Sequence, residues 1–340
     1  MVSLSSVRRQ LAQGRREGLR RVVLSGGEAT LHPEYLKIIR LARQLGYKHI
    51  QTITNGRRFC YPAFLEDAVA AGLDEITFSL HGHTPALHDR LTRTPGAFLQ
   101  AVAGLRAAVA MSGLIISVDV VINRLNLPVL RELLEFYIGL GVREFDLLAL
   151  VPFGDAWRRR RELFCDFSRP QELSQLHHAL ELGRRPDIHL WTNRLRPEYL
   201  EGFESFIQPP EKILDEVRGR RQMLARWIGG GKTPSCAGEA CPQCFLRDFC
   251  QDLARLLKAG CLPPRHGPLC SGSAGAGEPF RFRKKQDIVD FAEFYILSRY
   301  FAKGSRCGRC SLGLRCDGMN VRDIRQKGFS SMTPVEQVHG

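Results

Sequence analysis

Short apolar runs and longer amphipathic segments alternate along the first 195 residues of this chain. Strands that alternate with helices of this length form right-handed βαβ units around a parallel sheet. A further helical pattern precedes the first strand, from Ser5 to Gly18, so the chain enters the repeat on a helix. The apolar runs lie just before Gly26 and at 48–54, 75–80, 114–122 and 144–151, with helical patterns at 33–45, 62–71, 96–111 and 127–140.

The pattern changes beyond this region, which predicts three parts. Residues 1–195 form the α/β core, 196–230 a helical bridge, and 231–340 a cysteine-rich domain with a flexible loop at 271–277 and a helix at 286–301. No run of about 18 apolar residues occurs, so no membrane-spanning helix is predicted. The start has no apolar signal-peptide region, and we expect a cytoplasmic protein without membrane contact.

Small and polar residues stand where the predicted strands end. The carboxyl ends of parallel strands are where such sheets bind ligands, and a glycine lets a ligand touch the backbone. Each position also has a plainer interpretation, as a turn, a helix cap or a partner of the local backbone. The candidate residues are Ser25, Gly26, Gly27, Glu28, Thr54, Asn55, Ser79, His81 and Asn123.

Nine of the eleven cysteines lie after residue 235, in two closely spaced sets. In a cytosolic chain such sets are more typical of metal binding than of disulfides. Tetrahedral zinc and an iron–sulfur cluster both suit several converging thiolates. Cys60 and Cys165 are expected to be structural thiols, and Cys261 is a substitute ligand. The sets are Cys236-x4-Cys241-x2-Cys244-x5-Cys250 and Cys307-x2-Cys310-x5-Cys316.

The net charge of +14 is concentrated in runs of arginine and lysine at 158–161, 218–221 and 280–285. The third run interleaves aromatic and cationic residues, which would suit a single-stranded nucleic acid. Charge runs are more often solvated faces, and a cationic surface also suits an acidic peptide. Nucleic-acid binding is therefore a possible but not a favoured function.

The order of these motifs resembles that of the radical S-adenosylmethionine (SAM) enzymes. Their Gly-Gly-Glu motif corresponds to Gly26, Gly27 and Glu28 here, and their strand-end Thr-Asn-Gly corresponds to residues 54–56. The resemblance implies a partial (β/α)6 barrel that binds SAM through the strand-end residues given above. Ser79 and His81 match the strand end that meets the SAM ribose or carboxylate.

The resemblance also implies a first strand followed by a Cys-x3-Cys-x2-Cys loop, which holds a 4Fe–4S cluster for SAM. No cysteine precedes Cys60, and Met1 falls about where that loop should end. Either the reading frame starts upstream, which we favour, or the natural protein has lost the site. We expect the 340 residues as they stand to bind SAM weakly and not to cleave it.

The second cysteine set resembles the closing segment of SPASM and Twitch auxiliary domains. The continuation from Cys316 through Gly318 and Gly328 to Pro334 follows their pattern. In such domains an isolated cysteine after a proline-rich turn completes the site, and Pro268-Leu269-Cys270 fits that place. The resemblance implies one 4Fe–4S cluster on Cys270, Cys307, Cys310 and Cys316, and a second centre on Cys236, Cys241, Cys244 and Cys250. Zinc is the alternative metal for either set.

The resemblance implies an enzyme that uses SAM and iron–sulfur clusters for radical modification of a peptide or protein substrate. The cofactor carries the hard chemistry, while the protein orients substrate and excludes water. An electron donor such as a flavodoxin or ferredoxin is implied as a partner. The alternative is a non-catalytic, metal-bearing module derived from this fold that binds a peptide or RNA.

Overall fold

A computed structural model describes residues 2–231, 233, 234, 236, 238–271, 277–282 and 287–335. The interior of the expected loop at 271–277 and the basic residues 283–285 lie outside the described residues. The chain divides into two compact units. Unit 1 comprises Met1–Ala149 and Arg169–Trp191, and unit 2 comprises Leu150–Ser168 and Thr192–Gly340. Each unit is described by itself below.

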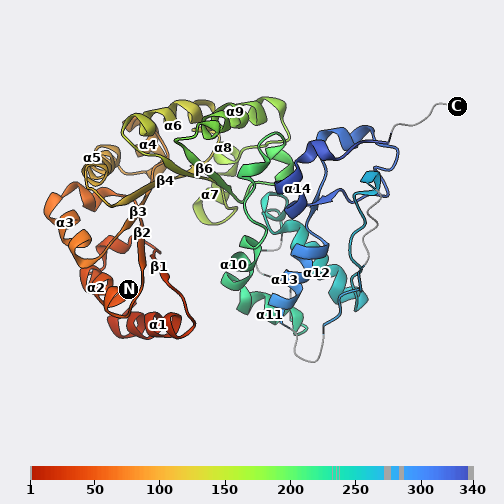
Figure 1. Ribbon diagram of the computed structural model, residues 1–340, viewed down its shortest axis with the longest axis horizontal. Coiled ribbons are helices and arrows are strands. Elements are labelled where there is room, and N and C mark those ends of the chain that lie inside the picture. The colour runs from red at the N-terminus through yellow and green to blue at the C-terminus, as the bar shows by residue number, and fades with distance from the viewer. Residues whose placement is uncertain are drawn as a thin grey trace. The chain divides into compact units, whose positions relative to one another are not determined.

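Unit 1 alternates strands and helices as its sequence pattern predicts (Figure 1). Helices α4 and α9 and strand β6 were not among the predicted elements; for α4, the start signal, Thr84 followed by Pro85, lies close behind a strand and its eight residues carry a weak pattern. The elements are α1 (Leu4–Arg16), β1 (Arg21–Leu24), α2 (Tyr35–Gln44), β2 (His49–Thr54), α3 (Pro62–Ala71), β3 (Glu75–Ser79), α4 (Pro85–Thr92), α5 (Ala97–Val109), β4 (Ile115–Ile122), α6 (Leu130–Gly139), β5 (Glu144–Ala149), α9 (Pro170–Leu180) and β6 (His189–Asn193).

The strands form one sheet in the order β1-β2-β3-β4-β5-β6. Each neighbouring pair from β1 to β5 is parallel, so the carboxyl ends of these strands meet at one edge. Ser79 lies opposite Asp119, and Asp119 lies opposite Asp146. The predicted α/β fold with a parallel sheet is confirmed.

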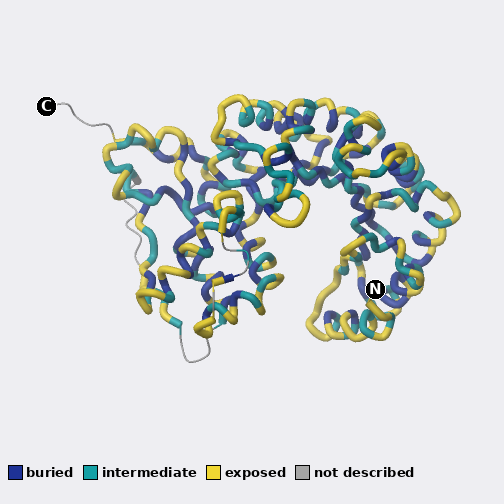
Figure 2. The backbone as a smooth tube through the Cα atoms, turned by 180° about the vertical axis from the view of Figure 1, so that it is seen from behind, coloured by how far each residue is buried: buried dark blue, intermediate teal, exposed yellow. Residues whose placement is uncertain are grey.

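The two faces of this sheet differ in polarity. One face carries buried apolar side chains, among them Ile50, Ile76, Phe78, Val118 and Phe145, and the helices of unit 1 lie along one side of the sheet (Figure 1). Successive residues of a strand point to opposite faces, so the residues between these apolar ones share the other face. Burial is concentrated in the strands and in the inward sides of the helices (Figure 2).

The second face of the sheet is polar. It carries Gln51, Glu75, Thr77, Ser117 and Asp119 in neighbouring register positions. A hydrogen-bonded chain crosses three strands, because the Gln51 amide donates to Thr77 at 2.6 Å and the hydroxyls of Thr77 and Ser117 lie 2.8 Å apart. Parallel sheets covered on both faces are usually apolar throughout. A polar face therefore indicates a surface that meets polar ligands or water.

Unit 2 is mainly helical, with one two-stranded antiparallel pair. Its core includes Phe249 of α12, whose ring centroid lies 5.1 Å from that of Phe291 and 5.2 Å from that of Tyr295 on α13. No described helix of the chain has the length and apolar character to cross a membrane. The elements are α7 (Gly154–Arg158), α8 (Arg160–Leu163), α10 (Lys212–Gly219), α11 (Arg221–Ile228), α12 (Arg247–Ala259), α13 (Ile288–Ser298), β7 (Phe301–Ala302), β8 (Met319–Asn320) and α14 (Val321–Lys327).

Candidate functional site

The turn at the carboxyl end of β1 presents an open stretch of backbone. Gly26 has a φ of +98° and Gly27 a φ of +55°, and residues other than glycine rarely adopt the first of these conformations. No atom lies within 4 Å of the place where a side chain would start at either glycine. Both residues are exposed. The backbone N–H and C=O groups of this turn are therefore accessible to a ligand.

Glu28 fixes this turn against the neighbouring strand end. Its Oε1 accepts hydrogen bonds from the Thr30 N–H at 3.1 Å, the Thr30 hydroxyl at 2.7 Å and the Thr54 hydroxyl at 2.7 Å. Its Oε2 accepts from the Asn55 N–H at 2.8 Å. A carboxylate that accepts four hydrogen bonds is firmly held. Glu28 thus orients the glycine turn and does not itself offer a free oxygen for most ligands.

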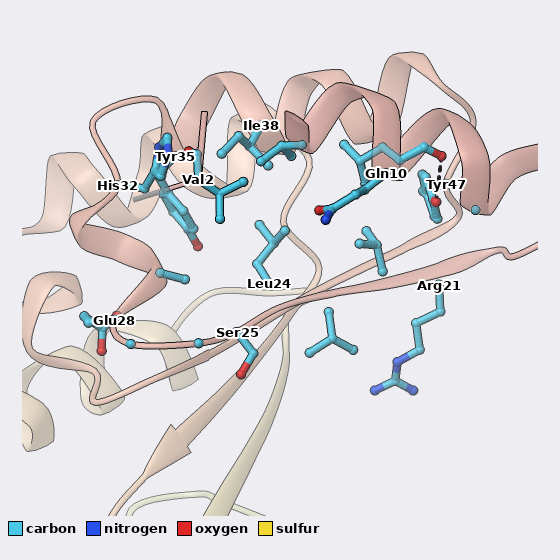
Figure 3. A pocket seen from close by; sticks show the side chains of 18 of the residues that line it. Val2, Gln10, Arg21, Leu24, Ser25, Glu28, His32, Tyr35, Ile38 and Tyr47 are labelled. Atoms are coloured by element: carbon cyan, nitrogen blue, oxygen red, sulfur yellow. Dashed lines mark hydrogen bonds between the residues drawn. The ribbon is translucent and has the colours of Figure 1, made fainter. Parts of the chain in front are cut away.

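A pocket of about 770 Å³ adjoins the turn and is lined by residues 25–29 together with side chains of α1, β1 and α2. Figure 3 shows Leu24 pointing toward Ile38 and Val2, whereas Ser25 and Arg21 point to the opposite side of the strand. The pocket is within the size range of small-molecule sites. Its polar end is the glycine turn, and most of its wall is apolar.

The ends of β3 and β4 form a second group of predicted residues. The Nδ1 of His81 accepts a hydrogen bond from the Val121 N–H at 3.3 Å, and the Asn126 amide donates to the His81 carbonyl at 3.1 Å. Asn123 is buried, and its side-chain carbonyl accepts from the N–H groups of Leu125 and Asn126. Its side-chain amide donates to the Val121 carbonyl. Asn123 therefore stabilises the turn after β4, which matches its plainer interpretation as a partner of the local backbone.

Burial and, to a smaller extent, the neighbouring His88 together lower the pKa of His81 to about 4. His81 is therefore neutral at physiological pH. Because its Nδ1 accepts the Val121 N–H, the ring proton resides on Nε2. His81 thus offers one fixed N–H donor at the strand ends, and it carries no positive charge.

An acidic pair lies on the polar face next to Ser79. Burial, then the facing carboxylate of Asp146 and then Glu75 together raise the pKa of Asp119 to about 7. Burial also raises the pKa of Glu75, which Arg21 and His49 oppose. A carboxyl group that titrates near neutral pH can hold or release a proton. Neither Asp119 nor Asn126 was singled out from the sequence.

The structure thus brings the predicted residues together in two groups at one edge of the sheet. Residues 26–28 contact Thr54 and Asn55 through Glu28, and Ser79, His81 and Asn123 lie at the ends of β3 and β4. Their assignment to SAM stays a prediction. Asn55 also matches its plainer interpretation in part, since its Oδ1 accepts the Arg57 N–H at 3.0 Å in a turn.

In unit 2, the first cysteine set lies around the start of α12. Burial raises the pKa of Cys250 to about 12, and the thiols of Cys244, Cys236 and Cys241 add to the rise. Burial likewise raises the pKa of Cys244. Burial and the neighbouring thiols therefore favour the protonated form of Cys244 and Cys250. A bound cation would reverse this preference, because a metal stabilises the thiolate form.

Burial and neighbouring thiols also act on the second cysteine set. Burial raises the pKa of Cys307, and the thiols of Cys316, Cys270 and Cys310 add to the rise. The segment before Cys270 lies directly against the segment after Cys316, because His266 and Asp317 exchange two hydrogen bonds of 2.8 and 3.0 Å. The sequence alone does not predict this contact between the segments at His266 and Asp317.

Backbone N–H groups point at three of the sulfurs. Gly238 donates to the Sγ of Cys241, Gly318 to that of Cys316 and Val335 to that of Cys310, each at 3.4 Å. Such hydrogen bonds tune thiolates that bind metals or clusters. Among the described residues, however, no three Cys, His, Asp or Glu side chains are arranged to hold a metal ion. The ligand sets stay a prediction.

The fold and the strand-end site define an α/β domain with a parallel sheet and a ligand-accessible glycine turn. Residues 1–137 match the family model described as "Radical SAM superfamily". This part of the chain thus matches the superfamily that its motifs indicated.

Two of the curated relatives that the chain matches show the extent of the similarity. A protein of Saccharolobus solfataricus named "Probable GTP 3',8-cyclase" is 32% identical over 140 residues, which cover 41% of this chain and 44% of that protein. The "PqqA peptide cyclase" of Ruegeria pomeroyi is 34% identical over 146 residues, which cover 43% of this chain and 38% of that protein. The chain thus spans less than half the length of the curated relatives it matches.

Among solved structures, one described as "Crystal structure of Streptococcus suis SuiB bound to S-adenosylmethionine" is similar over 94% of this chain and 66% of that chain. The TM-score is 0.44 and the sequence identity is 13%. Similarity at this level supports no inference about function.

Proposed function

We propose that this protein is a radical SAM enzyme that modifies a peptide or protein substrate, with the cysteine-rich part of unit 2 as an auxiliary iron–sulfur domain. The observation that carries the proposal is the turn at residues 26–28. Its glycines are open to a ligand, and its glutamate is held by four hydrogen bonds beside a pocket of about 770 Å³.

The chain's own residues fit a SAM-sized ligand at this edge of the sheet. The exposed N–H and C=O groups of Gly26 and Gly27 suit an amino acid moiety, and Ser25 adds a hydroxyl group. The apolar wall formed by Leu24 and Ile38 suits the less polar part of a ligand. His81 would offer its neutral Nε2–H to an acceptor. When bound, SAM and its iron–sulfur cluster supply one-electron radical chemistry.

The two cysteine groups fit iron–sulfur clusters by their donor chemistry. Each group holds four thiols that interact electrostatically, and three of the eight sulfurs accept backbone hydrogen bonds. Metal binding would require the thiols to lose their protons and approach one another more closely. The residues concerned are Cys236, Cys241, Cys244 and Cys250 in one group, and Cys270, Cys307, Cys310 and Cys316 in the other.

The substrate class is proposed from one relative. The protein of Ruegeria pomeroyi is named as a peptide cyclase, and the relative of Saccharolobus solfataricus is named as a nucleotide cyclase. The polar face of the sheet, with its titratable Asp119, suits a polar substrate with hydrogen-bonding groups. A peptide meets this requirement, and a net charge of +14 favours one with acidic residues.

The test is the formation of 5′-deoxyadenosine by the natural full-length protein after anaerobic reconstitution, with SAM and dithionite. Iron and acid-labile sulfide are assayed on the same sample. We expect iron and sulfide in equal amounts and SAM-dependent 5′-deoxyadenosine. Stoichiometric zinc without sulfide, together with no 5′-deoxyadenosine, would instead support a non-catalytic, metal-bearing binding module.

A further inference from the structure

A second pocket lies on the other side of the glutamate of the Gly-Gly-Glu turn. It has a volume of about 420 Å³ and is lined by residues of η1 (Ala29–Leu31), the end of β2, η2 (Arg57–Cys60), Tyr61 and α5. Glu28 and Leu31 line both this pocket and the larger one. We call it the arginine pocket, after Arg57 and Arg58 in its wall.

Neutral groups hold both arginines in place. The Arg57 Nε donates to the Gln100 carbonyl oxygen at 2.7 Å, and the Arg58 Nη1 donates to the Thr30 carbonyl at 2.7 Å. The Arg58 guanidinium also lies 4.3 Å from the ring centroid of Phe64. Each guanidinium keeps further N–H donors beyond these contacts. In the part of the chain that the structure describes, neither forms an ion pair with an acidic side chain.

The charge balance of the pocket leaves a single excess positive charge. Arg57 and Arg58 contribute two positive charges, and Glu28 contributes one negative charge whose oxygens are already occupied by Thr30, Thr54 and Asn55. An anion entering the pocket would therefore face unoccupied guanidinium donors. Guanidinium groups suit carboxylates because they can donate two parallel hydrogen bonds.

Two apolar side chains are exposed at the same pocket. Leu31 is 58% exposed and Tyr61 is 62% exposed. Exposed apolar side chains beside the two arginines can contact an organic ligand such as a peptide, whereas an inorganic ion would not use these contacts. Tyrosine and arginine are also the residue types that most often anchor protein partners.

We propose that the arginine pocket binds an acidic side chain of the peptide substrate and so fixes the peptide beside the Gly-Gly-Glu turn. This inference rests on the proposed function, because it assumes a peptide substrate. One net positive charge suits a single carboxylate better than a phosphate dianion, which the Glu28 carboxylate would repel more strongly. The shared wall of Glu28 and Leu31 places the bound acid next to the larger pocket.

The test measures the fluorescence anisotropy of a short peptide with a neutral label and capped ends that carries one glutamate, and of its glutamine analogue, at low salt. We expect the glutamate peptide to bind about 10-fold more tightly than the glutamine analogue. Arg57→Gln and Arg58→Gln should each weaken its binding roughly 5-fold, and the double variant should abolish the preference. Arg106→Gln is the matched control, because Arg106 lies exposed on α5 away from the pocket.

The double variant Arg57→Lys/Arg58→Lys keeps the charge and should retain part of the preference, which separates a lost charge from a lost fold. Equal binding of both peptides would overturn the inference. So would tighter binding of a short oligothymidylate, or displacement of the peptide by an equal concentration of inorganic phosphate. Loss of the glutamate preference with intact 5′-deoxyadenosine formation would overturn this inference alone. An intact preference without any 5′-deoxyadenosine would overturn only the proposed function.

Discussion

The glycine turn of unit 1 and the cysteine groups of unit 2 are both candidate cofactor sites, yet they are prepared in different ways. At the turn, the Glu28 carboxylate accepts four hydrogen bonds from its own chain. At the cysteines, burial and neighbouring thiols raise the pKa of Cys250 and Cys307. The glycine turn is formed by protein groups alone. The cysteine groups, in contrast, require a bound cation before their thiols lose their protons.

This difference has a consequence for stability. A site that is complete without its ligand changes little when the ligand is removed. A site whose thiols disfavour the charged form gains its stability from the metal, because metal binding and folding are coupled. We therefore expect metal to stabilise unit 2 strongly and unit 1 hardly at all.

The largest expected effect is the loss of one metal centre on mutation of Cys310. In the 340-residue chain, Cys310→Ser should lower the bound iron and sulfide by about half, because it removes a ligand from one of the two proposed four-thiolate centres. Iron and sulfide analysis after anaerobic reconstitution measures this. Cys60→Ser is the matched control in unit 1 and should leave both contents unchanged. An unchanged iron content in Cys310→Ser would remove that cysteine from the ligand set.

The next largest effect concerns Asp119, whose folded-state pKa of about 7 exceeds its ordinary value of 3.8. Between these pH values the folded protein binds more protons than the unfolded chain. The free energy of unfolding should therefore fall as the pH rises from about 4 to 7. Asp119→Asn removes this charge and should stabilise the protein at pH 8 by about 2–4 kcal/mol. Urea unfolding at pH 5 and pH 8 measures the effect, and a variant no more stable than wild type at pH 8 would contradict it.

A smaller effect tests whether the glycine turn is held as described. Glu28→Gln places an amide NH2 group where an oxygen now accepts, so two donors would face each other. The free energy of unfolding should fall by about 1–3 kcal/mol in this variant. Glu34→Gln is the control, because Glu34 forms only a surface ion pair with Lys37 and should cost less than about 0.5 kcal/mol. Equal stabilities of the two variants would contradict the role given to Glu28.

The smallest effect concerns His81, whose folded-state pKa of about 4 lies below its ordinary value of 6.5. The unfolded chain binds more protons between these values, so stability should fall as the pH drops from 6.5 to 4. His81→Gln can still accept the Val121 N–H but does not titrate. It should reduce the acid destabilisation in that window by about 1–2 kcal/mol. An identical pH dependence in variant and wild type would show that His81 is not buried as described.

Much of unit 1 could be predicted from the sequence, because its strands and helices follow simple periodic patterns. The strand-end residues were found for the same reason, since a parallel sheet collects its carboxyl ends at one edge. Asp119 could not be found this way. It lies within an apolar run, and its altered pKa comes first from burial and then from Asp146, which is adjacent only across the sheet.

The arginine pocket escaped prediction for a similar reason. No sequence pattern singled out Arg57 and Arg58, and their pocket also requires residues of η1 and α5. The cysteine groups were predicted from spacing, which indicates that thiols are close but does not place Cys270. Its neighbourhood depends on the contact between His266 and Asp317.

The most direct test of the central claim is SAM binding by the natural full-length protein after anaerobic reconstitution, measured by isothermal titration for Gly26→Val and for Gly113→Val. Both glycines have positive φ angles and open space around the missing side chain, so both variants strain the backbone alike. Gly113 precedes β4, at the opposite end of the strands. We predict that Gly26→Val weakens SAM binding at least about 10-fold, since a ligand could no longer reach the backbone, while Gly113→Val leaves it unchanged. Equal affinities in the two variants would contradict the assignment of the SAM site to the Gly-Gly-Glu turn.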